Sequence, residues 1–321
     1  MSGTPHAVVT GGAGFVGSHL IDSLLADGYQ VTSLDNFGSG RPANLSHIDS
    51  DRFKSVEHDV REPFPDLGSV DYIFHFASRA SPKDFESHAV EIALTNSEGT
   101  HNALSYARNH DATVILASTS EIYGDPEEHP QHEAYNGNVN IRGPRAPYDE
   151  SKRFSEALGI AYQQQYDIDI RTVRIFNTYG PRMRPDDGRV IPNFLSQALR
   201  GDDLTVYGDG SQTRSFCYID DLVQGIRAVA DAPSATVSGE VINLGSTDEI
   251  AIRELADVII DTIDPDCEVV YQDLPADDPQ VRRPDISRAE ERLDWTPAIS
   301  LSAGIEDTIP YFKTELGITS N

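Results

Sequence analysis

A glycine-rich turn between a short apolar run and a helical stretch is the feature that most constrains the fold of this chain. The segment VVTGGAGFVGSHL places Gly12, Gly14 and Gly17 in G-x-G-x-x-G spacing, with Gly11 one residue earlier. Such glycines let the backbone turn tightly and approach a pyrophosphate, whose charge is stabilised by N–H groups at a helix N-terminus. The motif predicts a dinucleotide site, although a tight turn without a ligand has the same spacing. The expected contacts in this turn are Gly11, Gly14, Phe15, Val16 and Gly17.

The rhythm of apolar runs around this turn indicates the fold class. Strand-length runs such as HAVVT, QVTSLD, VDYIFHFAS and ATVILAS alternate with helical stretches such as SHLIDSLLADG and NALSYARNH. Apolar strands that alternate with helices indicate a parallel sheet covered on both faces. We therefore expect an α/β chain with a Rossmann-type, doubly wound parallel sheet, which binds its ligands at the carboxyl ends of the strands.

An acidic residue at the end of the second predicted strand indicates which dinucleotide binds. Asp35 follows the glycines by about 20 residues, where a carboxylate can accept hydrogen bonds from the adenosine ribose. A 2′-phosphate would lie against that negative charge, so we expect NAD rather than NADP. Asn36, next to Asp35, and Asp59 and Val60 in EHDV are further candidates for cofactor contacts. An ordinary turn at the end of a strand explains Asp59 and Val60 equally well.

The pattern changes in the second half of the chain. After RTVRIFNTYGP the loops become longer and rich in Pro, Gly, Asp and Arg, with short helical stretches between them. We expect an NAD-binding domain over residues 1–180, rejoined by part of 216–246. A smaller, discontinuous α/β domain over 181–321 is expected to bind the substrate.

The charge of the chain excludes several classes of partner. There are 52 acidic residues against 25 basic ones, a net charge of −27, and the acidic residues are spread along the whole sequence. Such a chain repels nucleic acids and anionic membrane surfaces, so neither is an expected partner. The excess resembles that of proteins from salt-loving organisms and predicts that salt raises stability, because molar salt shortens the Debye length to about 3 Å.

Other sequence signals exclude a metal centre and a membrane anchor. Cys217 and Cys267 fit no metal-ligand spacing and are too few for a disulfide framework, so no metal is expected. No apolar run approaches the roughly 18 residues of a membrane span, and the N-terminal residues do not read as a signal peptide. The sequence therefore predicts a cytoplasmic protein.

A tyrosine and a lysine four residues apart are candidate reacting groups. Tyr148 and Lys152 in YDESK lie on one face of a predicted helix. A neighbouring ammonium favours the phenolate, so we expect Lys152 to lower the pKa of Tyr148 and let it take a proton from a sugar hydroxyl. The pair alone also fits an exposed helix face. Its weight increases because Lys152 is one of only four lysines in a chain that otherwise uses arginine.

Several strings together resemble a known family. TGGAGFVG, LDN, HFAS, TSEIYG and YDESK are similar to the extended short-chain dehydrogenase/reductase enzymes that act on nucleotide sugars, the NAD-dependent epimerase/dehydratase family. Within it, VNIRGPRAPYDESKR and LTVYGDGSQTRSFCYIDDLV are most similar to UDP-glucuronate decarboxylases. The resemblance covers nearly the whole chain. It implies an NAD-dependent lyase that converts UDP-glucuronate to UDP-xylose, and a homodimer.

The resemblance also implies roles for individual residues. Thr119 matches a hydroxyl beside the catalytic tyrosine, Tyr148 matches the acid/base and Lys152 its partner, while Asn96 matches an asparagine near the nicotinamide. The residues implied in binding the substrate are Ser120, Asn177, Arg182, Tyr207, Arg214 and Arg282. A surface ion pair explains Arg182 equally well, and the same holds for Arg184.

The residues that follow Thr119 bear on what happens to the 4-keto sugar that the resemblance implies. Dehydration needs an acid and a base near C5 and C6. In the related 4,6-dehydratases the two residues after the threonine resemble Asp-Glu, whereas this chain has Ser120 and Glu121. Loss of carbon dioxide needs only that the developing charge be stabilised, which hydrogen bonds from Thr119 and Tyr148 can do. Two carboxylates beside the carboxylate of a uronic acid would repel it, so a single one suits this substrate better. We therefore expect Thr119, Glu121, Tyr148 and Lys152 to be the catalytic set of a decarboxylase.

Two departures from the decarboxylase pattern keep other activities open. Arg79 stands where a small residue or proline is expected, and Asn136 replaces an aromatic residue. A nucleotide-sugar 4-epimerase is the main alternative and a 4,6-dehydratase a weaker one. A non-catalytic NAD-binding regulator is remote, because Thr119, Tyr148 and Lys152 are all present.

Overall fold

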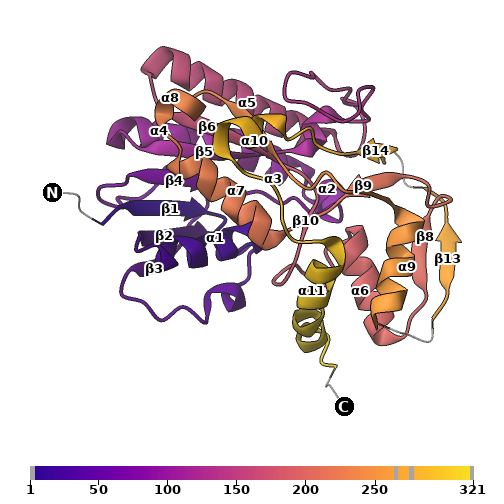
Figure 1. Cartoon of the computed structure of the whole chain (residues 1–321). Coiled ribbons are helices and arrows are strands. Elements are labelled where there is room, and N and C mark those ends of the chain that lie inside the picture. Colours follow the sequence, from indigo (N-terminus) through magenta and orange to yellow (C-terminus); the bar gives the residue numbers. More distant parts are fainter. Residues whose placement is uncertain (1–3, 264–266, 275–277, 319–321) are drawn as a thin grey trace.

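The structure is a computed structural model and describes residues 4–263, 267–274 and 278–318 (Figure 1). Its centre is a sheet of seven parallel strands in the order β11-β6-β5-β4-β1-β2-β3. The order reverses direction beside β1, as in doubly wound sheets that bind dinucleotides. The predicted α/β fold with a Rossmann-type sheet is confirmed.

The elements of the large sheet and its helices follow the predicted alternation closely. The strands are β1 (His6–Thr10), β2 (Gln30–Asp35), β3 (Phe53–Glu57), β4 (Tyr72–His75), β5 (Thr113–Thr119), β6 (Ile170–Ile175) and β11 (Val241–Leu244). The helices of this part are α1 (Phe15–Ala26), α2 (Asp84–Ser87), α3 (Ala89–Leu94), α4 (Thr100–His110), α5 (Ala146–Tyr166), α7 (Ile219–Asp231), α8 (Ser234–Val237) and α10 (Ser287–Leu293). Short 3-10 turns at Pro42–Leu45 and Ser120–Tyr123 and a π-helical turn at Thr95–Gly99 complete it.

Alternate residues of the strands pack against helices on opposite faces of the sheet. Val9 of β1 belongs to one buried cluster with Leu20 of α1 and Ile226 of α7, whereas Val8 belongs to a second cluster with Leu104 of α4. Both valines are fully buried. A strand buried on both faces has no polar side, which explains the continuous apolar runs in the sequence.

The remaining elements form a smaller α/β unit at the carboxyl ends of the strands. They are β7 (Thr178–Tyr179), α6 (Val190–Arg200), β8 (Leu204–Tyr207), β9 (Thr213–Ser215), β10 (Cys217–Tyr218), β12 (Glu249–Ala251), α9 (Ile252–Ile263), β13 (Val269–Gln272), β14 (Val281–Arg282) and α11 (Leu301–Glu315). Figure 1 shows α6, α9, β8 and β13 on the right, away from the large sheet.

The chain passes between the two parts more than once. It returns to the large sheet through α7 and β11, and α10 again packs beside β11, where Arg288 donates to the carbonyl of Val241 at 2.8 Å. Trp295, just after α10, donates its indole N–H to the carbonyl of Asp221 at 3.1 Å. The boundary near residue 180 stays a prediction.

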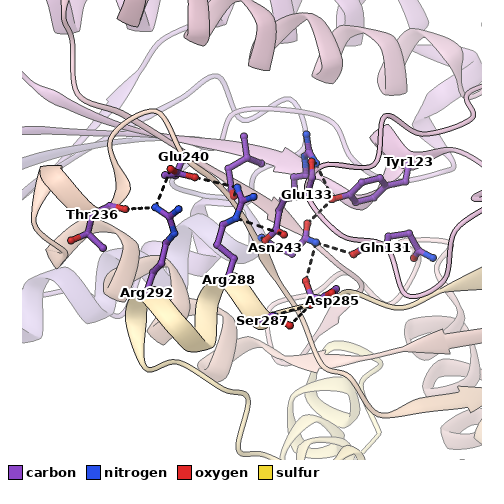
Figure 2. Close-up of polar contacts among 12 residues, drawn as sticks. Tyr123, Gln131, Glu133, Thr236, Glu240, Asn243, Asp285, Ser287, Arg288 and Arg292 are labelled. Carbon is purple, nitrogen blue, oxygen red and sulfur yellow. Dashed lines mark hydrogen bonds and ion pairs between the residues drawn. The ribbon is translucent and has the colours of Figure 1, made fainter.

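A buried asparagine connects the large sheet to two long loops (Figure 2). Asn243 of β11 is fully buried, and its amide oxygen accepts a hydrogen bond from Tyr123 at 2.8 Å. Its amide nitrogen donates to the carbonyls of Gln131 at 3.0 Å and Asp285 at 3.1 Å. The network therefore fixes the loop after β5 and the segment after β14 against one another.

Two further properties of the described residues bear on function. None of their helices has both the length and the apolar character needed to cross a bilayer. In the same ranges, no cluster of three or more His, Cys, Asp and Glu side chains is arranged to hold a metal ion.

Candidate active site

A cleft of about 470 Å³ runs along the carboxyl ends of the strands, between the large sheet and the smaller unit. Most of the residues predicted from the sequence line it. They are Gly11, Gly14, Phe15, Val16, Gly17, Asp35, Asn36, Val60, Thr119, Ser120, Glu121, Tyr148, Lys152, Asn177, Arg182, Tyr207, Arg214 and Arg282. Asp59 and Asn96 lie outside this lining. One continuous cleft thus brings the dinucleotide turn, the reacting groups and the arginines together.

The glycine turn forms one end of the cleft and fits a pyrophosphate. Gly11 has φ of +70°, and a Cβ there would lie 2.9 Å from the backbone of Ala77. A Cβ at Gly17 would collide with the Gly11 carbonyl oxygen, so α1 packs closely on the turn. No described side chain caps the N-terminus of α1, whose first N–H groups are left for an anionic ligand.

The aspartates near the ends of β2 and β3 have different surroundings. Asp35 is buried and accepts hydrogen bonds from the backbone N–H groups of Ala13 at 2.9 Å and Phe37 at 2.8 Å. Burial raises its pKa, and these two N–H groups oppose that rise. Asp59 instead forms an ion pair with Arg61 at 2.5 Å, and the hydrogen bonds from Arg61 lower its pKa to about 2. Asp35 lines the cofactor end of the cleft, whereas Asp59 lies outside that lining and is paired with Arg61.

Tyr148 and Lys152 lie one turn apart near the start of α5, and both are buried. The expected effect of the lysine on the tyrosine is wrong for the protein without ligands. Burial raises the pKa of Tyr148 to about 12. A hydrogen bond with Thr119 and the charge of Arg189 lower this pKa, but by less than burial raises it. Lys152 donates to the carbonyl of Ala117 at 2.9 Å, and burial lowers its pKa to about 8. Desolvation is the largest cause of both shifts.

Neighbouring groups hold this pair in place. The Tyr148 ring stacks on Phe85 with ring centroids 5.0 Å apart. Asn96 lies behind the pair, in the π-helical turn, and its amide donates to Ser151 at 3.0 Å. π-helical turns are frequent at functional sites. Asn96 thus supports the start of α5 from outside the cleft lining.

The carboxylate of Glu121 is clamped between two arginines. It follows the strand end, where its backbone N–H donates to the Thr119 hydroxyl at 3.2 Å. One oxygen is paired with Arg145, and the other lies 2.9 Å from Arg282. Burial raises the pKa of Glu121, but the charges of Arg145 and Arg282 outweigh this and hold the pKa at about 2. Glu121 is therefore an anion throughout the neutral range.

Arg282 also fixes the residue that precedes Glu121. Its guanidinium donates to the Ser120 hydroxyl at 3.2 Å and to the carbonyl of Gly124 at 2.8 Å, and it is 2% exposed. A guanidinium fork of this kind reads several acceptors at once, which a lysine cannot do. The turn after β5 is thereby tied to β14.

The other residues predicted to bind the substrate differ in exposure and in whether their polar groups have partners. Asn177 lines the cleft, and no described residue accepts a hydrogen bond from its buried amide nitrogen. Arg214 is paired with Asp278 at 3.0 Å. Arg182 is paired with Asp22 of α1 at 2.6 Å. Tyr207 is 38% exposed at the end of β8. Asn177 therefore has a hydrogen-bond donor ready for a ligand, and so does Arg182, whose buried Nη1 has no partner among the described residues although its Nη2 is paired.

Sequence reasoning missed three residues of this site. Arg145 and Asp149 lie close to Tyr148 in the sequence, but no motif there marks either of them as a site residue. Arg189 lies 41 positions from Tyr148 in the chain, yet its charge acts on the tyrosine. Its position depends on the loop before α6, and no periodic pattern predicts that loop.

Comparisons with known proteins show the family of this chain. The model of the NAD dependent epimerase/dehydratase family matches residues 7–245. UDP-glucuronic acid decarboxylase 1 of Xenopus tropicalis is 47% identical over 315 residues, which cover 98% of this chain and 73% of that protein.

Two solved structures with different activities have the same fold. UDP-glucose 4-epimerase of Thermotoga maritima, solved with UDP-glucose, superposes with a TM-score of 0.88 at 28% identity and covers 97% of this chain and 99% of its own. A dTDP-glucose 4,6-dehydratase of Streptomyces venezuelae, solved with NAD, has a TM-score of 0.86 at 30% identity over 97% and 98% of the two chains. The protein described here belongs to the NAD dependent epimerase/dehydratase family.

Proposed function

We propose that this protein is an NAD-dependent UDP-glucuronate decarboxylase that forms UDP-xylose. The observation that carries the proposal is the pairing of Glu121 with Arg145 and Arg282 beside Thr119 and Tyr148. This arrangement offers positive charge for a substrate carboxylate but only one carboxylate at the strand end. The decarboxylases among the relatives support the same substrate.

The cofactor end of the cleft fits NAD. We propose that the glycine turn holds the pyrophosphate and that Asp35 accepts hydrogen bonds from the adenosine ribose, with Asn36 and Val60 nearby. When bound, NAD supplies a cationic ring that favours the Tyr148 phenolate, accepts hydride from C4 of the sugar and returns it after carbon dioxide has left. The residues of this chain supply the rest of the chemistry.

The first role of these residues is to take a proton from the sugar. Tyr148 accepts the proton of the C4 hydroxyl, and Thr119 orients the phenolic oxygen through their hydrogen bond. Lys152, one helical turn away, contributes positive charge and a donor for the cofactor ribose. The sugar is thereby converted to a 4-keto acid whose carboxylate is β to the ketone.

The second role is to stabilise the loss of carbon dioxide. The C5–C6 bond breaks, its electron pair moves towards the C4 oxygen, and hydrogen bonds from Thr119 and Tyr148 stabilise the resulting enolate. Glu121 cannot act as an acid here, because the two arginines keep it ionised. Ser120 is neutral and bound to Arg282, so the second carboxylate of a dehydratase is missing.

The nucleotide end of the substrate lies towards the smaller unit in this proposal. The unpaired amide of Asn177 suits a phosphate oxygen, and Tyr207 offers an aromatic face for the uracil. A diphosphate has to compete with Asp278 for Arg214, whereas Arg182 keeps an Nη1 without a partner among the described residues, beside its ion pair with Asp22. We expect Arg214, which is less exposed, to make the stronger contact.

The main alternative remains a nucleotide-sugar 4-epimerase. Neither residue that departs from the decarboxylase pattern favours it, since Asn136 is exposed outside the cleft lining and Arg79 is paired with Glu91 at 2.8 Å. Incubation with NAD and either UDP-glucuronate or UDP-glucose, with carbon dioxide and product mass followed, separates the two. We expect carbon dioxide and UDP-xylose from UDP-glucuronate. Interconversion of UDP-glucose and its C4 epimer without carbon dioxide would establish the alternative.

Assembly and environment complete the proposal. We propose a homodimer that pairs through α3 and α5, where Val90, Phe154 and Ile160 are exposed apolar residues. Mass measurement at high salt tests it, and a monomer there would exclude it. We also propose a high-salt environment, from the net charge of −27. The cytoplasmic location predicted from the sequence stays a prediction.

A further inference from the structure

A second, smaller cavity lies behind the Glu121 clamp. Its volume is about 190 Å³, and it shares Glu121, Arg145, Asp278 and Arg282 with the main cleft. The rest of its lining is Gly124, Asp125, Asn138, Val139, Asn140 and Asp149. We call it the rear cavity. The ion-paired side chains of the clamp are thus the partition between the substrate cleft and the rear cavity.

Asp149 is the buried carboxyl group of the rear cavity. It lies in the first turn of α5, directly after Tyr148, and is 5% exposed. No described residue donates a hydrogen bond to its Oδ1 atom. An ionised carboxylate buried in this way would lose its hydration, and the charges of Arg145 and Arg282 would compensate that loss only in part. The geometry therefore favours a protonated Asp149 that faces the rear cavity, which has room for water.

The charges around the clamp agree with this protonation state. Among the buried and partly buried side chains, Arg145, Arg214 and Arg282 carry three positive charges, and Glu121 and Asp278 carry two negative ones. Asp125 also lines the rear cavity but is exposed, so solvent and salt screen its charge. With Asp149 neutral, the group has one positive charge in excess. The carboxylate of a uronic acid sugar would neutralise that excess, whereas an ionised Asp149 would remove it before the substrate arrives.

The proposed reaction consumes one proton that the mechanism has not yet supplied. Tyr148 takes a proton from the C4 hydroxyl and returns it when the C4 carbonyl is reduced. Breaking the C5–C6 bond releases carbon dioxide and leaves an electron pair on the enolate, which needs a separate proton at C5. The arginines hold Glu121 ionised, so it has no proton to give.

We propose that Asp149 is the source of the proton taken up at C5, passed through water beside Glu121, and that the rear cavity reloads Asp149 from solvent. The inference rests on the proposed decarboxylase function. In each turnover the Asp149 O–H bond breaks, a C5–H bond forms, and a hydronium ion from the cavity water restores the acid. Asp149 acts through water and is a relay residue that does not touch the sugar.

The electrostatic surroundings of Asp149 give this relay a pH dependence. Burial, followed by the charge of Glu121, raises the pKa of Asp149 to about 8, against the opposing charges of Arg145 and Arg282. Glu150 on the same helix adds to the rise, and Asp278 lines the same cavity. The acid is therefore loaded below about pH 8, and turnover falls above it.

The test compares wild type with Asp149→Asn, which keeps the size of the side chain and removes its proton. With NAD and UDP-glucuronate in molar KCl, we expect wild-type kcat to fall above about pH 8. Asp149→Asn should lower kcat by about 100-fold, with KM within a few fold, and any alkaline limb that remains should be that of Lys152, whose pKa is also about 8. Reduced nicotinamide, measured by its absorbance, should accumulate in the variant, because oxidation of the sugar at C4 proceeds and protonation at C5 does not.

Two further variants separate a relay from a structural role. Asp149→Glu keeps the acid and should restore a large part of kcat and the alkaline limb. Glu150→Gln removes a neighbouring carboxylate, 42% exposed and paired with Arg153, and should leave kcat below pH 7 unchanged while it moves the alkaline limb slightly to lower pH. Should Asp149→Asn fail to fold, the alkaline limb of wild type still decides, since a kcat that stays constant to pH 9 overturns the relay.

The failures of the two proposals are distinguishable. Wild type that releases no carbon dioxide from UDP-glucuronate overturns the proposed function and the relay with it. Wild type that forms UDP-xylose, together with Asp149→Asn at a kcat within about twofold of it, overturns the relay alone.

Discussion

The guanidinium of Arg282 lies 2.9 Å from the carboxylate of Glu121, although the two residues come from opposite halves of the chain. Arg282 belongs to β14 in the smaller unit, and Glu121 follows β5 of the large sheet. Their ion pair forms part of the wall between the substrate cleft and the rear cavity. The pair also makes the position of Glu121 depend on the packing of β14, which comes late in the chain.

Replacing Glu121 by Gln should impair decarboxylation and leave NAD binding largely intact. The change removes the anion that orients both arginines, so the substrate carboxylate would meet misplaced positive charge. We expect kcat for carbon dioxide release to fall by about 100-fold or more, because misplacement at a reacting centre has effects of that size. NAD affinity, measured by titration, is the control. Full activity of Glu121→Gln would contradict the role given to this residue.

Replacing Asp35 by Ser should weaken the preference for NAD over NADP. The wild-type carboxylate is buried at the cofactor end of the cleft, where a 2′-phosphate would lie against its charge. We expect the ratio of NAD to NADP affinity to fall by at least about tenfold, or 1.4 kcal/mol. Glu57→Gln is the matched control, because Glu57 pairs with Asp35 in the sheet and is exposed. A wild-type preference for NADP would contradict the assignment.

Replacing Lys152 by Met should stabilise the protein without NAD at neutral pH while abolishing activity. Burial lowers the pKa of Lys152 from 10.5 to about 8, so between these values the unfolded chain binds the proton more tightly than the folded one. Stability therefore rises with pH over that window, and the cost of the buried ammonium is complete below about pH 8.

The size of this effect follows from the shift, less the hydrogen bond to Ala117 that the variant loses. We expect the free energy of unfolding to increase by about 1–3 kcal/mol at pH 7, with the gain fading towards pH 10.5. Denaturant titrations in molar KCl measure it, and Lys54→Met, at an exposed lysine, is the control. A gain that does not depend on pH would contradict this account.

The fold was predictable from the sequence to a greater extent than the site. Apolar runs such as HAVVT are fully buried strands, and the turn with Gly11 and Gly17 has room for nothing larger than glycine, so local pattern was sufficient there. The pKa of Tyr148 was not predictable, because it depends on burial that spacing along a helix does not reveal. Arg145 and Asp149 were missed for a related reason, since only the folded chain places them behind Glu121.

Replacing Asn243 by Ala should destabilise the protein through the network in Figure 2. The change leaves the Tyr123 O–H donor and the Asp285 carbonyl without their partner in a buried region, whereas the Gln131 carbonyl keeps the Asp285 N–H. Buried unsatisfied groups of this kind make a loss of about 2–4 kcal/mol the expected result of denaturant titration. Asn136→Ala, at an exposed asparagine, is the control. A loss below about 1 kcal/mol would show that water replaces the amide.

Raising the KCl concentration from low salt to molar should raise the melting temperature. The chain has a net charge of −27 and only 25 basic residues, so its surface carboxylates repel one another in the compact state. At about 3 Å the Debye length in molar salt is shorter than most surface separations, and the repulsion is screened. Partly buried pairs such as Arg282 with Glu121 are screened much less, so the site should keep its geometry. Sucrose at matched osmolality is the control for preferential exclusion. A melting temperature that stays constant across the KCl series would contradict the proposed adaptation to high salt.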